Sequence, residues 1–144
     1  MEGIELAKSE LIHNNYTCVV VQGKEVIMTS FHNGVRPLIE FYDTQNGTNR
    51  SFLPPPVLAD KVIGRAAALL AVLCGITSIY THIISEEAKK VLDFYKIPVA
   101  YEKLVPYIIN RNGDGLCPME ELSIGVNEPI EMYNKIMKWL AERN

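Results

Sequence analysis

The first residues that could bind a ligand are two cations four positions apart, Lys61 and Arg65. The same stretch also holds Asp60 and Gly64. We expect this stretch to open a helix, so both cations would lie on one face near its positive end, where they oppose the helix dipole. A bound anion would reverse that penalty, because backbone N–H groups and both side chains would converge on it. Gly64 would let a ligand approach closely. The stretch predicts an anion site, and a surface ion pair of Asp60 with the two cations explains the same pattern.

A second candidate anion site lies at residues 110–115, with the sequence NRNGDG. Glycine and asparagine tolerate positive φ, so successive N–H groups can form an anion-binding nest. Arg111 adds a planar guanidinium suited to phosphate. An ordinary exposed turn has the same composition. The two stretches together predict a nucleotide or another phosphate-bearing small molecule as ligand, bound by Asp60, Lys61, Gly64, Arg65, Asn110, Arg111, Gly113 and Asp114.

Cys117 is the candidate nucleophile of the chain. It directly precedes Pro118, the expected first residue of a helix, and a thiol at a helix N-terminus can have a lowered pKa. Glu120 follows within one turn, but no histidine lies nearby in the sequence to activate the thiol. A free cysteine is commonly a small buried hydrophobic residue instead. The sequence leaves open whether the protein is an enzyme.

Hydrophobic periodicity predicts the elements that must position these residues. The expected helices cover residues 4–13, 36–43, 59–73 and 85–95, with one more from Pro118 and a last one over 129–142. The expected strands cover 16–21 and 25–30, joined by a tight glycine turn, then 78–84 and 97–101, and residues 104–109 fit a strand or an extended segment. Residues 44–56, polar and then proline-rich, predict a loop.

The order of these elements predicts the fold class. Strand–helix–strand alternation indicates a mixed sheet with helices on both faces, so we expect a three-layer α-β-α domain that spans residues 1–144. The last helix carries an apolar stripe that we expect to face the core. Its members are Ile130, Tyr133, Met137 and Leu140.

Charge and cysteine usage exclude several classes of partner. Lysines and arginines number 14 against 17 acidic residues, a net charge of -3, which argues against a dedicated nucleic-acid binder. The N-terminus lacks the features of a signal peptide, and the longest apolar run is far short of the ~20 residues that span a bilayer. The three cysteines fit neither a disulfide framework nor a Cys-x-x-Cys metal pair. We therefore expect a cytoplasmic protein with no membrane partner and no cofactor, and a homo-oligomer is left open.

Three stretches carry a resemblance to a known family. They are ADKVIGRAAA at residues 59–68, KLVPYIINR at 103–111 and GLCPME at 115–120. They are similar to an uncharacterised "domain of unknown function" family that is assigned to the cytidine deaminase-like fold. The resemblance covers nearly the whole chain and implies that fold for it.

The chemistry of that fold depends on zinc motifs. A zinc nucleobase deaminase needs a His/Cys-x-Glu at the start of one buried helix and a Pro-Cys-x-x-Cys at the start of the next. Here the two expected helices open with DKVIG from Asp60 and SEEA from Ser85, and His82 alone does not make a closed zinc site. The resemblance therefore implies the fold without a metal and without deamination. A noncatalytic interaction or scaffold protein on the same fold is the alternative to ligand binding.

Overall fold

A computed structural model of the chain describes residues 2–46 and 54–143. Its helices are α1 (Glu2–Asn14), α2 (Arg36–Asn46), α3 (Arg65–Leu73), α4 (Glu86–Phe94), α5 (Pro118–Leu122) and α6 (Pro129–Ala141). Its strands are β1 (Cys18–Gln22), β2 (Glu25–Ser30), β3 (Pro56–Ile63), β4 (Ile79–Ser85) and β5 (Val99–Val105). The loop expected over 44–56 lies outside the described residues at 47–53. Within the described part, α2 extends to Asn46 and β3 already begins at Pro56.

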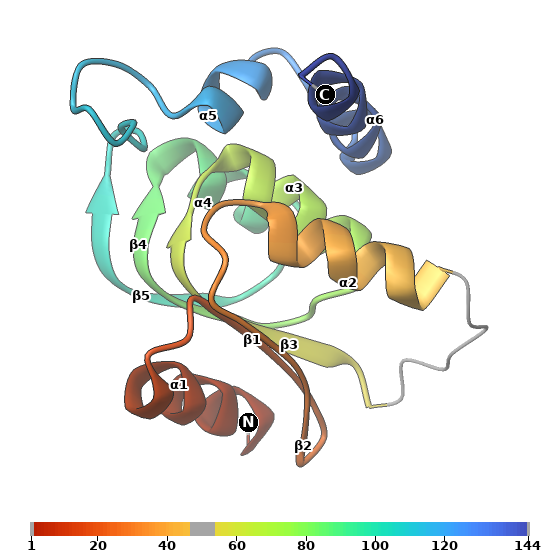
Figure 1. Cartoon of the computed structure of the whole chain (residues 1–144). Coiled ribbons are helices and arrows are strands. Elements are labelled where there is room, and N and C mark those ends of the chain that lie inside the picture. The colour runs from red at the N-terminus through yellow and green to blue at the C-terminus, as the bar shows by residue number, and fades with distance from the viewer. Residues whose placement is uncertain (1, 47–53, 144) are drawn as a thin grey trace.

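The strands form one mixed sheet in the order β2-β1-β3-β4-β5. The expected hairpin of β1 and β2 is confirmed, and its turn holds Gly23 at a φ of +67°, which glycine adopts without steric cost. β1 also pairs antiparallel with β3, whereas β3, β4 and β5 run parallel. The helices α3 and α4 are the crossovers between the parallel strands, so both begin at the same edge of the sheet (Figure 1).

Helices cover both faces of this sheet (Figure 1). On one face, α1 places Ala7 and Leu11 against Val19, and Ala59 of β3 belongs to the same apolar cluster. The neighbouring residues of both strands point the other way, so Leu58 joins the larger cluster under α2, α3, α4 and α6. A mixed sheet covered on both faces agrees with the expected three-layer α/β architecture. Among the helices of the described ranges, none is long and apolar enough to cross a membrane.

The helix expected over 59–73 is wrong over residues 59–64. Residues up to Ile63 belong to β3, and α3 begins only at Arg65, after Gly64 in an extended conformation. β3 lies between β1 and β4 and is buried on both faces, so its side chains form a nearly continuous apolar run. Such a run resembles a buried helix in sequence. The correction moves Asp60 and Lys61 from a helix to a strand.

Two further expectations change near the C-terminus. The last parallel strand runs over Val99–Val105 rather than 97–101. The stripe expected on the core side of α6 is correct only at Tyr133, which packs against the core. Ile130, Met137 and Leu140 are 46%, 37% and 42% exposed. The buried side chains of this helix are Met132 and Ile136, which belong to the core cluster under α3. Apolar residues of α6 cover a wider part of the helix surface than the face that packs on the core. The hydrophobic periodicity therefore could not identify which of them are buried.

Candidate functional site

The N-terminal end of α3 is occupied by a side chain from another element. The Glu120 carboxylate of α5 accepts a hydrogen bond from the backbone N–H of Arg65, with Oε1 at 2.6 Å, and a longer one from the N–H of Ile108, with Oε2 at 3.4 Å. Glu120 is only 7% exposed. A carboxylate at this end of a helix is stabilised by the free N–H groups and by the helix dipole.

Gly64 makes room for that carboxylate. A Cβ atom at this position would lie 2.4 Å from Oε1 of Glu120 and 3.2 Å from Cγ1 of Ile108. The φ of Gly64 is -96°, an ordinary value for any residue. The close approach, and not the backbone conformation, therefore requires glycine here. The close neighbour of Gly64 in this structure is a side chain of the same chain, whereas the sequence pattern predicted a ligand there.

The Arg65 side chain holds the segment that follows α5. Its Nε donates to the carbonyl of Ser123 at 3.3 Å, and its Nη2 donates to the carbonyl of Val126 and to Oδ1 of Asn127. Ser123 is itself buried and donates its hydroxyl to the carbonyl of Glu120 at 2.7 Å. Arg65 thus binds a folded-back segment through its side chain while its N–H binds Glu120. Its Nε and Nη2 donors are committed within the protein in this conformation.

Lys61 lies away from Arg65, on the other side of the sheet. It belongs to β3 and has the same orientation as Ala59, which packs under α1. Its Nζ donates to Oδ1 of Asn15, just after α1, at 3.0 Å. The expectation that Lys61 and Arg65 share a helix face is therefore wrong, because a strand and a helix start at Arg65 replace the single helix.

Asp60 is a buried carboxyl group rather than a surface partner of these cations. It is 6% exposed, and its neighbours in register are Cys18 of β1 and Thr81 of β4. Burial raises the pKa of Asp60 to about 8, although hydrogen bonds from the N–H groups of Val62 and Lys61 and from the Cys18 thiol oppose that change. Burial, and then the nearby Asp60, raise the pKa of Cys18 well above its usual value. Asp60 is thus held largely protonated near neutral pH.

The loop at 110–115 binds three of its N–H groups internally, those of Asn110, Gly113 and Asp114. Oδ1 of Asn110 accepts from the N–H of Gly113 at 2.9 Å and from that of Asp114 at 3.3 Å, and its Nδ2 donates to Asp114 at 3.0 Å. The N–H of Asn110 donates to the carbonyl of Gly115, which closes the turn. Arg111 is exposed. The described geometry is that of a self-capped turn, and its N–H groups do not converge with those at α3.

Cys117 stands at the start of α5 but does not cap it. Its side chain makes no capping hydrogen bond, and its N–H donates to the carbonyl of Ile108 at 3.0 Å. The thiol is free and half-buried. α5 is only five residues long, so few aligned peptide dipoles act on the thiol. Cys117 positions the chain that carries Glu120.

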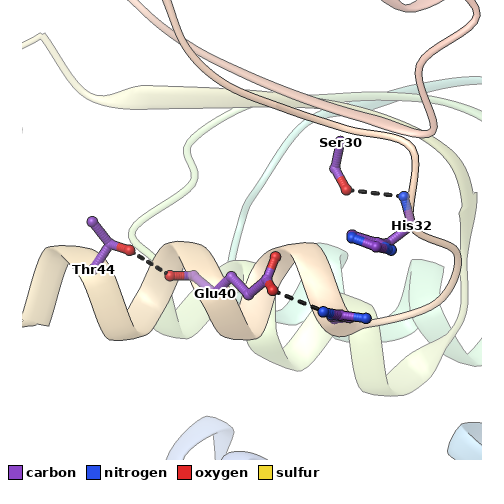
Figure 2. A network of polar contacts seen from close by, with 5 residues as sticks. Ser30, His32, Glu40 and Thr44 are labelled. Carbon is purple, nitrogen blue, oxygen red and sulfur yellow. Dashed lines mark hydrogen bonds and ion pairs between the residues drawn. The ribbon is translucent and has the colours of Figure 1, made fainter.

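Polar contacts at the end of β2 and along α2 involve a buried serine and exposed residues. The N–H of His32 donates to Oγ of Ser30 at 3.0 Å, and the carbonyl of Glu40 accepts from the hydroxyl of Thr44 (Figure 2). The Glu40 carboxylate forms an ion pair with Arg36 at 3.2 Å, and both side chains are more than half exposed. Arg36 and His32 are therefore solvated surface groups.

The donor set at the two helix starts does not suit zinc. α3 opens with Gly64, Arg65 and Ala66, and α4 opens with Ser85, whose Oγ accepts the N–H of Ala88 at 3.1 Å. No thiol or imidazole stands at either start. Within residues 2–46 and 54–143, no group of three histidine, cysteine, aspartate or glutamate side chains could hold a metal ion. We derive no zinc chemistry from this site.

The residues that sequence reasoning missed are Glu120 and Ser123 as partners of α3. Glu120 is 55 positions from Arg65 in the chain, and neither periodicity nor a local motif joins them. The sequence did contain one indication of Glu120: it lies in the GLCPME stretch, which carries part of the family resemblance. Of the predicted residues, the structure brings together Gly64 and Arg65 at one place and Asn110, Gly113 and Asp114 at another.

Comparison with known proteins supports the family and the fold. Residues 6–140 match the family described as "TM1506: Domain of unknown function (DUF1893)". The crystal structure of a DUF1893 family protein (TM1506) from Thermotoga maritima is similar to this chain, with a TM-score of 0.80 and 22% sequence identity over 93% of this chain and 87% of that one. No curated protein matches the chain significantly. The chain therefore belongs to the DUF1893 family, a family of unknown function.

Proposed function

We propose that the protein binds a small phosphate-bearing ligand, a nucleotide or a sugar phosphate, at the N-terminal end of α3. There the anionic group of the ligand takes the place of the Glu120 carboxylate. The observation that carries the proposal is that carboxylate, which is buried and accepts the N–H of Arg65 at 2.6 Å. A helix end that already holds a carboxylate has the donors and the electrostatic preference for another anion. Open α/β sheets also bind ligands beyond the carboxyl ends of their parallel strands, where α3 begins.

The exchange requires α5 to move, and α5 is suited to moving. It has five residues, well below the ~12–15 residues at which an isolated helix becomes marginally stable, so its conformation depends on its contacts. Pro118 and Glu121 of α5 are exposed, whereas Glu120 is buried. Displacement of this short element frees the N–H groups of Arg65 and Ile108 together. If Ser123 moves with α5, the Nε of Arg65 is released as a further donor for the same ligand.

The proposal includes the cytidine deaminase-like fold with a degenerate metal site. It is supported by the two helices that follow adjacent parallel strands and start at one edge of the sheet, where a zinc deaminase carries its two ligand motifs. Arg65 and Glu120 occupy this edge in place of metal ligands. We assign no reaction to it. A cytoplasmic location belongs to the same proposal, since Cys18, Cys74 and Cys117 are all free thiols, as suits a reducing compartment.

A noncatalytic interaction or scaffold role is the second candidate. It is favoured by the internal satisfaction of both predicted anion sites, at Arg65 and at Asn110. Polar groups paired within the protein in this way need no ligand for their hydrogen bonds. On this account Glu120 is a permanent cap of α3.

A thermal-shift screen of nucleotides and sugar phosphates separates the two candidates. Three proteins are compared: the parent, Glu120→Ala, and Glu121→Ala as a control with the same charge change on the exposed side of α5. Ligand at 100 times its Kd should stabilise the parent by ~2.7 kcal/mol. Glu120→Ala should respond at lower ligand concentration, because the competing carboxylate is gone, and Glu121→Ala should respond like the parent. A panel in which no compound shifts either the parent or Glu120→Ala contradicts the proposal and favours the scaffold role.

A further inference from the structure

β5 differs from the other parallel strands in its exposure. Every residue from Ala100 to Leu104 is exposed, so both faces of the strand meet solvent, whereas β3 and β4 are largely buried. Tyr101 and Leu104 are 37% and 42% exposed, and they point to opposite faces. β5 is the last strand in the sheet order and lies at its outer edge (Figure 1). The strand therefore offers apolar side chains on both faces next to an open edge.

The register of β5 identifies the backbone groups on that edge. Val99 is paired with Ile79 of β4, and the N–H of Ile79 donates to the carbonyl of Pro98 at 3.0 Å. Alternate residues of a strand turn their N–H and C=O to the same side. Ala100 and Glu102 therefore face β4, and Val99, Tyr101 and Lys103 turn both groups outward. Among the described residues, no other strand pairs with this side of β5.

Natural proteins protect such edges with prolines, bulges or charged side chains, lysine above all, because an unprotected edge pairs with other strands. β5 is seven residues long, contains no proline, and its register with β4 shows no bulge. Its charged side chains are one acid and one base, Glu102 and Lys103, so the pairing must keep both away from like charges. We propose that this edge is a self-association surface, on which β5 of a second copy of the chain pairs antiparallel to form one continuous sheet across a two-fold axis. The inference is independent of ligand binding at α3.

Charge excludes two of the possible registers of that pairing. In an antiparallel pair, directly opposite side chains lie on the same face of the sheet and contact each other. A two-fold axis through the pair places the residue on the axis opposite the same residue of the second copy. An axis at Glu102 or at Lys103 would place like charges opposite each other, which is destabilising. An axis at Tyr101 pairs the two tyrosines, a favourable aromatic contact. It sets Val99 opposite Lys103 of the second copy and Ala100 opposite Glu102 of the second copy.

The Tyr101 register also agrees with the backbone. Its opposed pairs are Tyr101 with its copy and Val99 with Lys103, which are the residues whose N–H and C=O groups point outward. All five paired residues, 99–103, lie within β5 (Val99–Val105). A second copy also presents the same exposed side chains as the first. Pairing therefore covers Tyr101 of both chains at once, which an unrelated polar peptide would not do.

The first experiment measures the mass in solution by sedimentation velocity up to about 100 µM, well above the Kd of a ~μM interface. We expect the parent at twice the mass of one chain. Tyr101→Lys, which places two like charges at the axis, should be a monomer with an unchanged fold by circular dichroism. Phe94→Lys, the same change at another exposed aromatic side chain (78% exposed), should remain a dimer. A monomeric parent, or a dimer that survives Tyr101→Lys, overturns the proposal.

The second experiment tests the register by cross-linking in a Cys117→Ser background, which leaves Cys18 and Cys74 buried. Opposed residues in a hydrogen-bonded pair have Cα atoms ~5.5 Å apart, within the range of a disulfide. Tyr101→Cys should therefore give a covalent dimer under mild oxidation. Lys103→Cys should not, because Val99 of the second copy faces it. Cross-linking that is stronger at Lys103→Cys than at Tyr101→Cys overturns the proposed register.

Discussion

Replacement of Gly64 by alanine adds a single methyl group at the contact between α3 and α5 and so tests that contact. The added Cβ would lie 2.4 Å from Oε1 of Glu120, 3.0 Å from its Cδ and 3.2 Å from Cγ1 of Ile108. The carboxylate must move and give up its bond from the Arg65 N–H. Overpacking costs ~1–3 kcal/mol and loss of a charge-assisted hydrogen bond ~1.5–3 kcal/mol. We expect Gly64→Ala to lower the free energy of unfolding by about 3–5 kcal/mol.

Urea denaturation measures this loss, with Gly115→Ala as the matched control. A Cβ at Gly115 would meet only Nδ2 of Asn110, at 3.7 Å, so the control should stay within about 1 kcal/mol of the parent. In a Glu120→Ala background the main obstacle is absent, and Gly64→Ala should lose most of its effect. An equal loss of stability in both backgrounds, or none in the parent, would refute the assigned contact.

Three other predictions follow from the described contacts. The pKa of Asp60 is raised to about 8 from 3.8, so this group stabilises the fold fully below about pH 4 and its contribution declines as pH rises towards 8, by ~1.4 kcal/mol per pH unit. Urea midpoints at several pH values should show this decline in the parent but not in Asp60→Asn, and parallel pH profiles would contradict the assignment. Arg65→Ala should lower stability by ~2 kcal/mol or more, because it leaves the carbonyls of Ser123 and Val126 without their donor. Lys61→Ala loses one surface hydrogen bond to Asn15 and should stay within ~0.5 kcal/mol of the parent. Thermal denaturation measures both variants, and an equal loss of stability in the two would contradict the different roles assigned to Arg65 and Lys61. Elemental analysis should find no stoichiometric zinc, and cytidine should be left unreacted, because no cysteine or histidine stands at the starts of α3 and α4; one retained zinc per chain would overturn this expectation.

Local signals allowed much of the fold to be predicted. The Gly23 turn between two β-branched runs specified the hairpin. The helix expected over 85–95 is confirmed as α4, and Ser85 caps it through its side chain. The central strand β3 was mistaken for a helix because burial on both faces removes the alternation that marks a strand. Only the pairing of β3 with β1 and β4 shows which structure it adopts.

The candidate site was predicted less completely, for a physical reason. Gly64 and Arg65 were found because their residue types suit a helix end, but Lys61 points to the opposite face once β3 is a strand. The partner of that helix end, Glu120, comes from a distant element. Its contact depends on tertiary packing, which no local pattern encodes.

The most direct test of the central claim is the backbone N–H resonance of Arg65 in Glu120→Ala. The variant removes the carboxylate that occupies this donor, and inorganic phosphate is titrated while amide shifts are followed by NMR. We expect saturable changes at Arg65 and Ile108 that are larger than those at Gly113 and Asp114. Titration with sodium chloride to the same ionic strength is the control. No saturable change at Arg65, or larger changes in the 110–115 loop, would contradict the claim that the start of α3 binds anions.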